Sequence, residues 1–254
     1  MNFTIFIPLL LGWLAGWLVN YLADVLPATR KFSRPACPHC HAPYSWATYL
    51  SFGDCTACGK RRSLRTLLVQ AALTVASLLL WIFPRTLLPY SLALLLLVFL
   101  TLVLVTDLEY RLILHPVSLA GAALGLGIGV YLRASYTTVG AGIVNTLIGG
   151  AAGFGIMLVF YFLGELYVRR MSKRRGMSPD EVALGFGDVN LSGILGLLLG
   201  WPSVTVGLIF AIFAGGLVSL GVIVVLLLSK KYKAFTPIPY APFLIFSVIF
   251  LLYR

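Results

Sequence analysis

Runs of apolar residues long enough to cross a lipid bilayer recur along the whole sequence. Of the 254 residues, 60% are hydrophobic and only 11% are charged, and the mean hydropathy of +0.98 is far above that of a soluble domain. A helix of roughly 20 apolar residues spans the bilayer hydrocarbon, which is about 30 Å thick, and no strand-length alternation is present. The sequence therefore predicts an all-α, polytopic membrane protein.

The spacing of the apolar runs predicts about eight transmembrane helices in three regions. The N-terminus lacks the positively charged start of a secretory signal, so the first run is interpreted as a retained helix. We expect residues 1–26 to form the first transmembrane helix, residues 27–65 a cytoplasmic loop, and residues 66–254 a transmembrane core. The helices are expected at about 3–26, 66–82, 90–107, 112–132, 139–168, 189–200, 204–229 and 238–253.

Basic residues are concentrated in a few loops, and this predicts the orientation of the chain. A net charge of +11 would suggest nucleic-acid binding in a soluble protein, but 16 of the 19 basic residues fall in loops on one side of the predicted helices. The positive-inside rule then places the N-terminus outside, and the partner of these charges is the lipid bilayer and not nucleic acid. Only Arg85, Arg133 and Arg254 are expected outside.

All four cysteines lie in the one sizeable polar insertion, as two Cys-x-x-Cys pairs separated by fourteen residues. The pairs are Cys37 with Cys40 and Cys55 with Cys58. Two such pairs can place four thiolates around one Zn²⁺. Two disulfides are the alternative, but a cytoplasmic loop keeps its thiols reduced. His39 and His41 could compete as ligands, yet a complete cysteine set favours a structural zinc site in a small hairpin domain.

Two aspartates lie at the ends of apolar runs. Asp107 ends one run in Thr106-Asp107-Leu108-Glu109, and Asp188 begins another directly after Gly185-Phe186-Gly187. An ionisable residue at membrane depth is costly, so it is a candidate functional residue. Both aspartates fall at the predicted inner face.

A carboxylate pair can hydrolyse a peptide bond if one member takes a proton from water while the other, protonated, polarises the carbonyl. Gly185 and Gly187 would then permit positive φ and let a substrate backbone approach Asp188. The alternatives are that Asp188 only caps a helix and Asp107 only ends one, or that the acids serve transport. Glu109 would support the pair, or simply bind a basic residue of a neighbouring loop.

Other polar and glycine positions have structural explanations. Dense glycines in residues 121–155 and 207–221 are expected to let helices pack closely. Glu165 is expected to pair with Arg169, and Asp24 is treated as a surface acid. The proline-rich strip at residues 236–243 could line a groove or only break a helix, and the sequence leaves both open.

These motifs resemble those of the bacterial type IV prepilin peptidases, GxGD-type aspartic proteases of the inner membrane. The specific match is Gly185-Phe186-Gly187-Asp188, and Asp107 matches the family's first catalytic aspartate. The paired cysteine loop, Asn20 and residues 237–243 also fit, so the resemblance covers nearly the whole chain. It implies cleavage of the leader of prepilin or pseudopilin precursors, after a glycine, at the cytoplasmic face. Many members then methylate the new N-terminus with S-adenosylmethionine.

Three positions depart from the family pattern. Asn190 stands where the family often has lysine, residues 114–116 replace Ile-Pro-Asp, and Gln70 replaces an acidic residue. None of these changes removes a catalytic acid, so the resemblance still implies proteolysis. Gln70 lies in the region tied to methyl transfer, so the resemblance supports that second activity less.

We therefore expect an eight-helix inner-membrane aspartic endopeptidase with a zinc-bound cytoplasmic hairpin. Asp107 and Asp188 would be its catalytic pair, and the basic leader of the substrate would be drawn to acids such as Glu109. One alternative is an ion- or proton-coupled transporter that uses the same carboxylates, although no inverted repeat is recognisable. Another is a non-catalytic assembly factor that binds pilins through the zinc loop.

Overall fold

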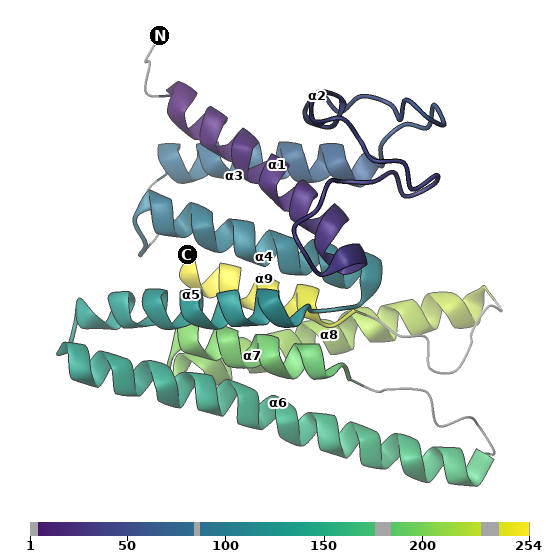
Figure 1. The fold of residues 1–254 in the computed structure, drawn as a ribbon. Coiled ribbons are helices and arrows are strands. Elements are labelled where there is room, and N and C mark those ends of the chain that lie inside the picture. Colours follow the sequence, from purple (N-terminus) through teal and green to yellow (C-terminus); the bar gives the residue numbers. More distant parts are fainter. Residues whose placement is uncertain (1–4, 84–86, 176–183, 230–238, 254) are drawn as a thin grey trace. The chain divides into compact units, whose positions relative to one another are not determined.

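The computed structural model describes residues 5–83, 87–175, 184–229 and 239–253, and within these ranges the chain is almost entirely helical (Figure 1). All eight predicted helices are present, and the polar insertion adds one short helix. The helices are α1 (Phe6–Thr29), α2 (Trp46–Leu50), α3 (Leu64–Ile82), α4 (Tyr90–Tyr110), α5 (His115–Ala134), α6 (Val139–Arg175), α7 (Phe186–Leu199), α8 (Ser203–Leu228) and α9 (Ala241–Leu252).

Six of these helices, α1, α3, α4, α5, α6 and α8, are long and apolar enough to cross a membrane. The other two long helices are apolar but shorter, with 14 residues in α7 and 12 in α9. At 1.5 Å per residue, α7 spans only about 21 Å, less than the hydrocarbon thickness. The chain is thus a polytopic, all-α membrane protein, as predicted.

Helix boundaries differ from the prediction where polar residues stand near helix ends. Helix α4 continues to Tyr110, three residues beyond its predicted end. Helix α5 begins at His115, and Pro116 occupies its first turn, where no backbone N–H is required. In the proline-rich strip, Pro242 likewise lies in the first turn of α9. Residues 236–238 of that strip lie outside the described ranges.

The chain divides into two compact units, Met1–Leu112 and Ile113–Arg254. In the first unit, α1 packs on α3 through buried polar groups as well as apolar ones. Gln70 Nε2 donates to the Trp13 carbonyl oxygen at 2.6 Å, and Ser77 Oγ donates to the Pro8 carbonyl oxygen at 2.6 Å. A Cβ on Gly16 would lie 2.9 Å from Gln70 Oε1, so glycine permits this approach.

In the second unit, α7 packs against α5, α6 and α9. Helices α6 and α7 approach backbone to backbone, because a Cβ on Gly149 would lie 2.5 Å from the Gly196 carbonyl oxygen. Close packing at Gly149 was predicted and is confirmed, whereas the part of Gly196 was not predicted. Five other glycines of α5, α6 and α8 have no neighbour within 4 Å of a Cβ position, and the packing explanation is wrong for them: Gly127, Gly140, Gly155, Gly216 and Gly221.

Arg133, in the last turn of α5, joins α5, α6 and α7 in the second unit. Its Nε donates to Asn145 Oδ1 at 2.8 Å, its Nη1 to the Gly129 carbonyl oxygen at 2.7 Å, and its Nη2 to the Leu198 carbonyl oxygen at 3.2 Å. Asn145 in turn donates to the Trp201 carbonyl oxygen at 2.9 Å. From the sequence, Arg133 was expected only to be a charged residue of an outer loop. In the structure its side chain instead hydrogen-bonds to residues of three helices.

Candidate functional site

Asp107 lies in the last turn of α4, which ends three residues later. The Arg111 amide donates to the Asp107 carbonyl oxygen at 2.9 Å, and Arg111, with φ of 51°, ends the helix in the left-handed region. Only 6% of the Asp107 surface is exposed. A carboxyl group is therefore held inside the protein at a helix end, as the sequence indicated.

Asp188 is the third residue of α7 and is also buried, with 8% of its surface exposed. The N-cap is Gly185, and the Asp188 amide donates to the Gly185 carbonyl oxygen at 3.0 Å. The alternative in which Asp188 is the capping residue is therefore wrong. Its carboxyl group nevertheless lies in the first turn of α7, where a negative charge is favoured by the helix dipole.

The two motif glycines provide space and not unusual backbone geometry. Gly185 has φ of −72°, and neither Gly185 nor Gly187 has a positive φ, so that part of the prediction is wrong. A Cβ on Gly187 would lie 3.0 Å from Ile113 Cβ, and one on Gly185 would lie 3.4 Å from Asp188 Oδ2. Gly187 thus allows the segment before α5 to approach the start of α7. Because Gly185 has no side chain, the space next to the Asp188 carboxylate stays open.

Aromatic residues fix the start of α7. The Phe186 ring makes edge contacts with Tyr161 and Phe154 of α6, at centroid distances of 5.8 and 6.3 Å. Tyr240, just before α9, is also close enough to interact electrostatically with Asp188. Tyr240 belongs to the proline-rich strip that could line a groove, but its proximity to Asp188 could not be predicted from the sequence, because it depends on how α9 packs on α7.

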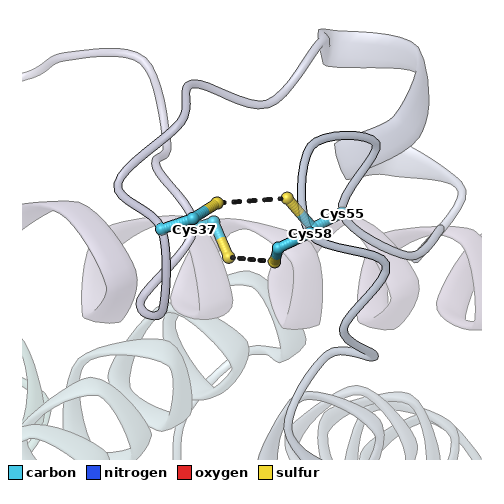
Figure 2. Close-up of side chains that lie close together, drawn as sticks. Cys37, Cys55 and Cys58 are labelled. Carbon is cyan, nitrogen blue, oxygen red and sulfur yellow. Dashed lines mark hydrogen bonds between the residues drawn. The ribbon is translucent and has the colours of Figure 1, made fainter.

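The four cysteines come together in the polar insertion (Figure 2). Their sulfur atoms all lie within 4.8 Å of one another, with Cys37 Sγ 3.7 Å from Cys58 Sγ and Cys40 Sγ 3.6 Å from Cys55 Sγ. Four sulfurs at 2.3 Å from a tetrahedral Zn²⁺ would be about 3.8 Å apart. All four cysteines are free of disulfides, so the arrangement fits a metal ion and contradicts the disulfide alternative.

Each cysteine pair forms the same backbone turn. The Cys37 amide donates to Ala42 and the His41 amide to Cys37, while the Cys55 amide donates to Lys60 and the Gly59 amide to Cys55, at 2.7 to 3.0 Å. His41 and Gly59 hold equivalent positions with positive φ of 57° and 67°. His41 is therefore a turn residue, and among the described residues the cluster with metal-ligand spacing consists of the four cysteines alone.

Hydrogen bonds within these turns also stabilise some of the cysteines as thiolates, the form that binds a cation. Burial alone would raise the pKa of Cys37, but hydrogen bonds from the Cys40 and His39 backbone outweigh it and lower the pKa to about 6. Backbone hydrogen bonds from Cys58 and Ala57 lower the pKa of Cys55. A backbone hydrogen bond from Ala42 favours the Cys40 thiolate, yet desolvation and the other cysteine side chains raise its pKa to about 12. Four sulfurs that cannot all ionise together suit a divalent metal ion, which would neutralise them.

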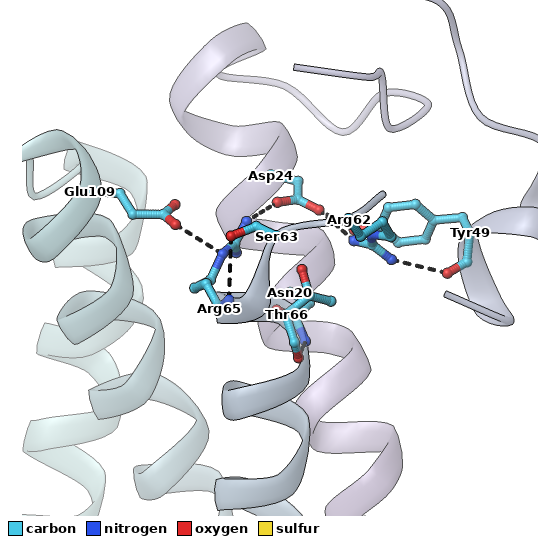
Figure 3. Close-up of polar contacts among 8 residues, drawn as sticks. All are labelled: Asn20, Asp24, Tyr49, Arg62, Ser63, Arg65, Thr66 and Glu109. Atoms are coloured by element: carbon cyan, nitrogen blue, oxygen red, sulfur yellow. Dashed lines mark hydrogen bonds and ion pairs between the residues drawn. The ribbon is translucent and has the colours of Figure 1, made fainter. Parts of the chain in front are cut away.

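A network of ion pairs connects the hairpin to the helix ends of the first unit (Figure 3). Arg62 Nη2 lies 2.8 Å from Asp24 Oδ2, Arg65 Nη2 pairs with Asp24 Oδ1, and Arg65 Nε lies 3.0 Å from Glu109 Oε1. Tyr49 donates a hydrogen bond of 2.6 Å to Asp24 Oδ2. Glu109 thus pairs with an arginine from a neighbouring loop or helix start, which is one of the two roles considered for it. Asp24 is a partly buried acid with three partners and not an isolated surface acid.

A cavity of about 680 Å³ adjoins this network and the first cysteine turn, within the first unit. The hairpin packs on α1 beside it through an aromatic cluster. The Trp17 and Tyr21 rings stack at 5.9 Å, and Tyr49 makes edge contacts with both at 6.2 and 6.5 Å. Burial, with a smaller effect of the Asp24 charge, raises the pKa of Tyr49, so its hydroxyl stays protonated and keeps donating to Asp24.

The predicted site residues divide between the two units. The four cysteines, Glu109 and Asp107 belong to the first unit, and Gly185, Gly187 and Asp188 belong to the second. The four cysteines lie together as predicted, and their role as metal ligands stays a prediction. The pairing of Asp107 with Asp188 stays a prediction from the sequence.

These features define a class of protein: a helical, polytopic membrane protein with buried acids at helix ends and a hairpin whose four clustered cysteines have the spacing of a metal site. A family model described as the type IV leader peptidase family matches residues 94–220, which include both aspartates. The chain belongs to this family and is a peptidase.

Relatives with a related name align with most of the chain. The chain is 26% identical over 230 residues to a prepilin leader peptidase/N-methyltransferase of Aeromonas hydrophila, covering 87% of this chain and 71% of the relative. A protein of the same name from Aeromonas salmonicida is 27% identical over 220 residues, covering 83% and 68%. No solved structure matches the chain. Nothing in these comparisons favours the transport alternative.

Proposed function

We propose that this peptidase is an aspartic endopeptidase that removes the leader from prepilin or pseudopilin precursors at the cytoplasmic face of the bacterial inner membrane. Asp107 and Asp188 act together on one water molecule and one peptide carbonyl. The observation that carries the proposal is that the family match spans both aspartates, and that each is a buried acid in the terminal turn of an apolar helix.

The helix ends suggest which aspartate does which task. Asp188 lies in the first turn of α7, at the positive end of the helix dipole, which favours a carboxylate. Asp107 lies in the last turn of α4, at the negative end, which favours the neutral acid. We therefore assign water activation to Asp188 and polarisation of the carbonyl to Asp107, with one proton shared by the pair.

Zn²⁺ bound by the four cysteines has a structural role in this proposal. A complete set of four thiolate ligands leaves no coordination position for water or substrate, so the metal would hold the two turns of the hairpin together. Residues 27–65 then form a cytoplasmic zinc-binding domain between the first transmembrane helix and the peptidase core at residues 66–254. This orientation puts the N-terminus outside and follows from the positive-inside rule.

Methyl transfer from S-adenosylmethionine is a second candidate activity, favoured by the names of both relatives. In this chain Gln70 uses its amide N–H group to bind the Trp13 carbonyl oxygen across α1 and α3. A carboxylate at that position could not donate this bond, so the departure at Gln70 has a structural explanation.

The test is incubation of the purified protein in detergent with a prepilin, followed by mass spectrometry of the product. We expect loss of the leader, and addition of one methyl group only if S-adenosylmethionine is present and the second activity exists. Asp107→Asn and Asp188→Asn should each lower cleavage by at least about a thousandfold while metal content stays normal. Asp54→Asn is the matched control, because Asp54 is a half-exposed hairpin acid and its variant should cleave normally. Cleavage at the normal rate by either catalytic variant would overturn the proposal.

A further inference from the structure

The guanidinium group of Arg65 connects the ends of three helices in the first unit (Figure 3). Arg65 is the second residue of α3. Its Nη2 pairs with Asp24 of α1, and its Nε lies 3.0 Å from Glu109 Oε1 in the last turn of α4. The Arg65 side chain is 19% exposed, so these pairs are shielded from water more than surface pairs are. One side chain therefore ties the end of α4 to α1 and α3.

The Asp24 side of this connection is itself held in place. Asp24 Oδ2 accepts hydrogen bonds from Tyr49 Oη at 2.6 Å and from Arg62 Nη2 at 2.8 Å. The Arg62 side chain is only 8% exposed, and its guanidinium lies 4.1 Å above the Tyr49 ring. Two carboxylates face two guanidinium groups, so the charges balance within the network. Asp24 is thus a fixed anchor for Arg65.

The position of Arg65 is unfavourable for helix α3 alone. A cation in the first turn of a helix faces the positive end of the helix dipole, which destabilises it. Asp24 and Glu109 compensate this charge only because α1 and α4 end beside the start of α3. The presence of arginine at position 65 is therefore explained by its ion pairs with α1 and α4 and not by the stability of α3.

The Arg65–Glu109 pair anchors the last turn of α4, which also contains Asp107. Glu109 is two residues beyond Asp107, and the helix ends at Tyr110 with Arg111 in the left-handed conformation. A terminal turn without such a tie tends to fray, and an aspartate in it would move with the backbone. We propose that Arg65 is a positioning residue for Asp107, acting through Glu109. This inference rests on the proposed catalytic role of Asp107.

The positioning role predicts a different kinetic signature from a role of Glu109 in attracting the basic leader. If Glu109 attracted the leader, its loss would raise KM, and loss of Arg65 would free the carboxylate and lower KM. If the Arg65–Glu109 pair positions Asp107, loss of either partner lowers kcat and leaves KM nearly unchanged.

The experiment measures kcat and KM for leader cleavage in five purified variants. Arg65→Gln and Glu109→Gln should each lower kcat about 10- to 100-fold, the size expected from misplacing a catalytic group by about 1 Å, with KM within about twofold. The double variant should lose no more than the worse single variant, because the residues act as one unit. Arg65→Lys should lie between Arg65→Gln and the unaltered protein, since one ammonium group cannot bridge both carboxylates as guanidinium does.

Arg61→Gln is the matched control for charge. Its side chain is 90% exposed and lies 3.9 Å from Asp54, so the change removes a nearby positive charge without touching the network. We expect kcat and KM within about twofold of the unaltered protein. Glu109→Gln also checks that a loss of kcat is not caused by misfolding, because this variant keeps the Arg65–Asp24 pair. Zinc content and thermal midpoint are recorded for every variant.

The outcomes separate this inference from the proposed function. If Asp107→Asn is inactive but Arg65→Gln keeps its kcat, the inference fails and the proposed function stands. Independent, multiplying losses in the double variant, or a KM increase on Glu109→Gln without loss of kcat, would also overturn the inference. If Asp107→Asn cleaves normally, the proposed function fails first, whatever Arg65 does.

Discussion

Both units of this peptidase contain close glycine contacts between helices, but they join the ends of their helices by different means. In the first unit, side-chain charges join the helix ends: Arg62 and Arg65 face Asp24 and Glu109, and a cysteine cluster suited to zinc holds the hairpin. In the second unit, backbones meet directly at Gly149 and Gly196, and Arg133 binds neutral carbonyl and amide oxygens.

This difference shows that a partly buried arginine can be accommodated in two ways. Arg65 stands at the positive end of its helix and depends on two carboxylates. Arg133 stands in the last turn of α5 and binds a carbonyl in the last turn of α7, so the negative ends of two helix dipoles stabilise it without any acid. The first unit should therefore respond to metal and proton concentration, whereas the second should respond mainly to loss of its packing and of its Arg133 hydrogen bonds.

Metal removal is expected to have the largest effect and to act on the first unit. Without Zn²⁺ the two cysteine turns have little to hold them together, since the hairpin contains one five-residue helix and a small buried core. Chelation or Cys37→Ser should therefore expose residues 36–60 to protease while α5 to α9 stay protected. Full protection of the hairpin in metal-free protein would contradict the structural role of the metal.

The pH dependence of metal binding follows from the thiol pKa values. Zinc binding requires thiolates, and the pKa of Cys40, about 12, means that binding displaces at least its proton at neutral pH. Affinity should rise with pH, and it should fall more steeply below about pH 6, where Cys37 also becomes protonated. Competition titrations with a zinc indicator between about pH 5 and pH 8 measure this, and a pH-independent affinity would count against the site.

A bulky residue at the α6–α7 contact should have the next largest effect. Gly149→Leu would place its side chain against the Gly196 carbonyl and the Gly200 backbone, and should lower the free energy of unfolding by about 3 kcal/mol. Gly155→Leu in the same helix is the matched control, because no atom lies within 4 Å of its Cβ position, and it should change stability by no more than about 0.5 kcal/mol. Equal losses in detergent unfolding would refute the backbone-contact explanation.

Loss of Arg133 should have a smaller effect. Arg133→Ala removes charge-assisted bonds to the Asn145, Gly129 and Leu198 oxygens and should cost about 2 kcal/mol. Arg169→Ala removes an exposed ion pair with Glu165, which is four residues away in the sequence and whose Oε1 lies 2.5 Å from Arg169 Nη2. This change should lower the free energy of unfolding by no more than about 0.5 kcal/mol. Thermal unfolding midpoints compare the two, and a larger shift for Arg169→Ala would reverse the ranking.

Much of the fold and the metal site could be predicted from the sequence, because their signals are local. Apolar runs mark the helices, and two Cys-x-x-Cys pairs mark a metal site wherever the chain places them. Asp107 and Asp188 were recognised because an acid beside an apolar run is costly, and both are buried in terminal turns. The predicted ion pair of Glu165 with Arg169 needed only the helical spacing of four residues.

The missed features depend on partners far away in the sequence. Asp24 was treated as a surface acid, but its partners Tyr49, Arg62 and Arg65 are 25, 38 and 41 residues away. Arg133 binds a carbonyl 65 residues away. A side chain that binds backbone oxygens leaves no complementary charge in the sequence, so no charge pattern could have indicated this contact.

The central claim is that Asp107 and Asp188 meet, and disulfide trapping tests it most directly. Zinc-loaded protein carrying Asp107→Cys and Asp188→Cys is oxidised in membranes, digested and searched by mass spectrometry for a peptide joining positions 107 and 188. A disulfide requires Cα atoms within about 7 Å, so we predict this link. The control pairs Asp107→Cys with Ser203→Cys, which should form no link. Ser203 lies beyond the far end of α7, and that end is about 17 Å from Asp188 along the helix. Absence of the 107–188 link, or an equal yield in the control, would contradict the catalytic pair.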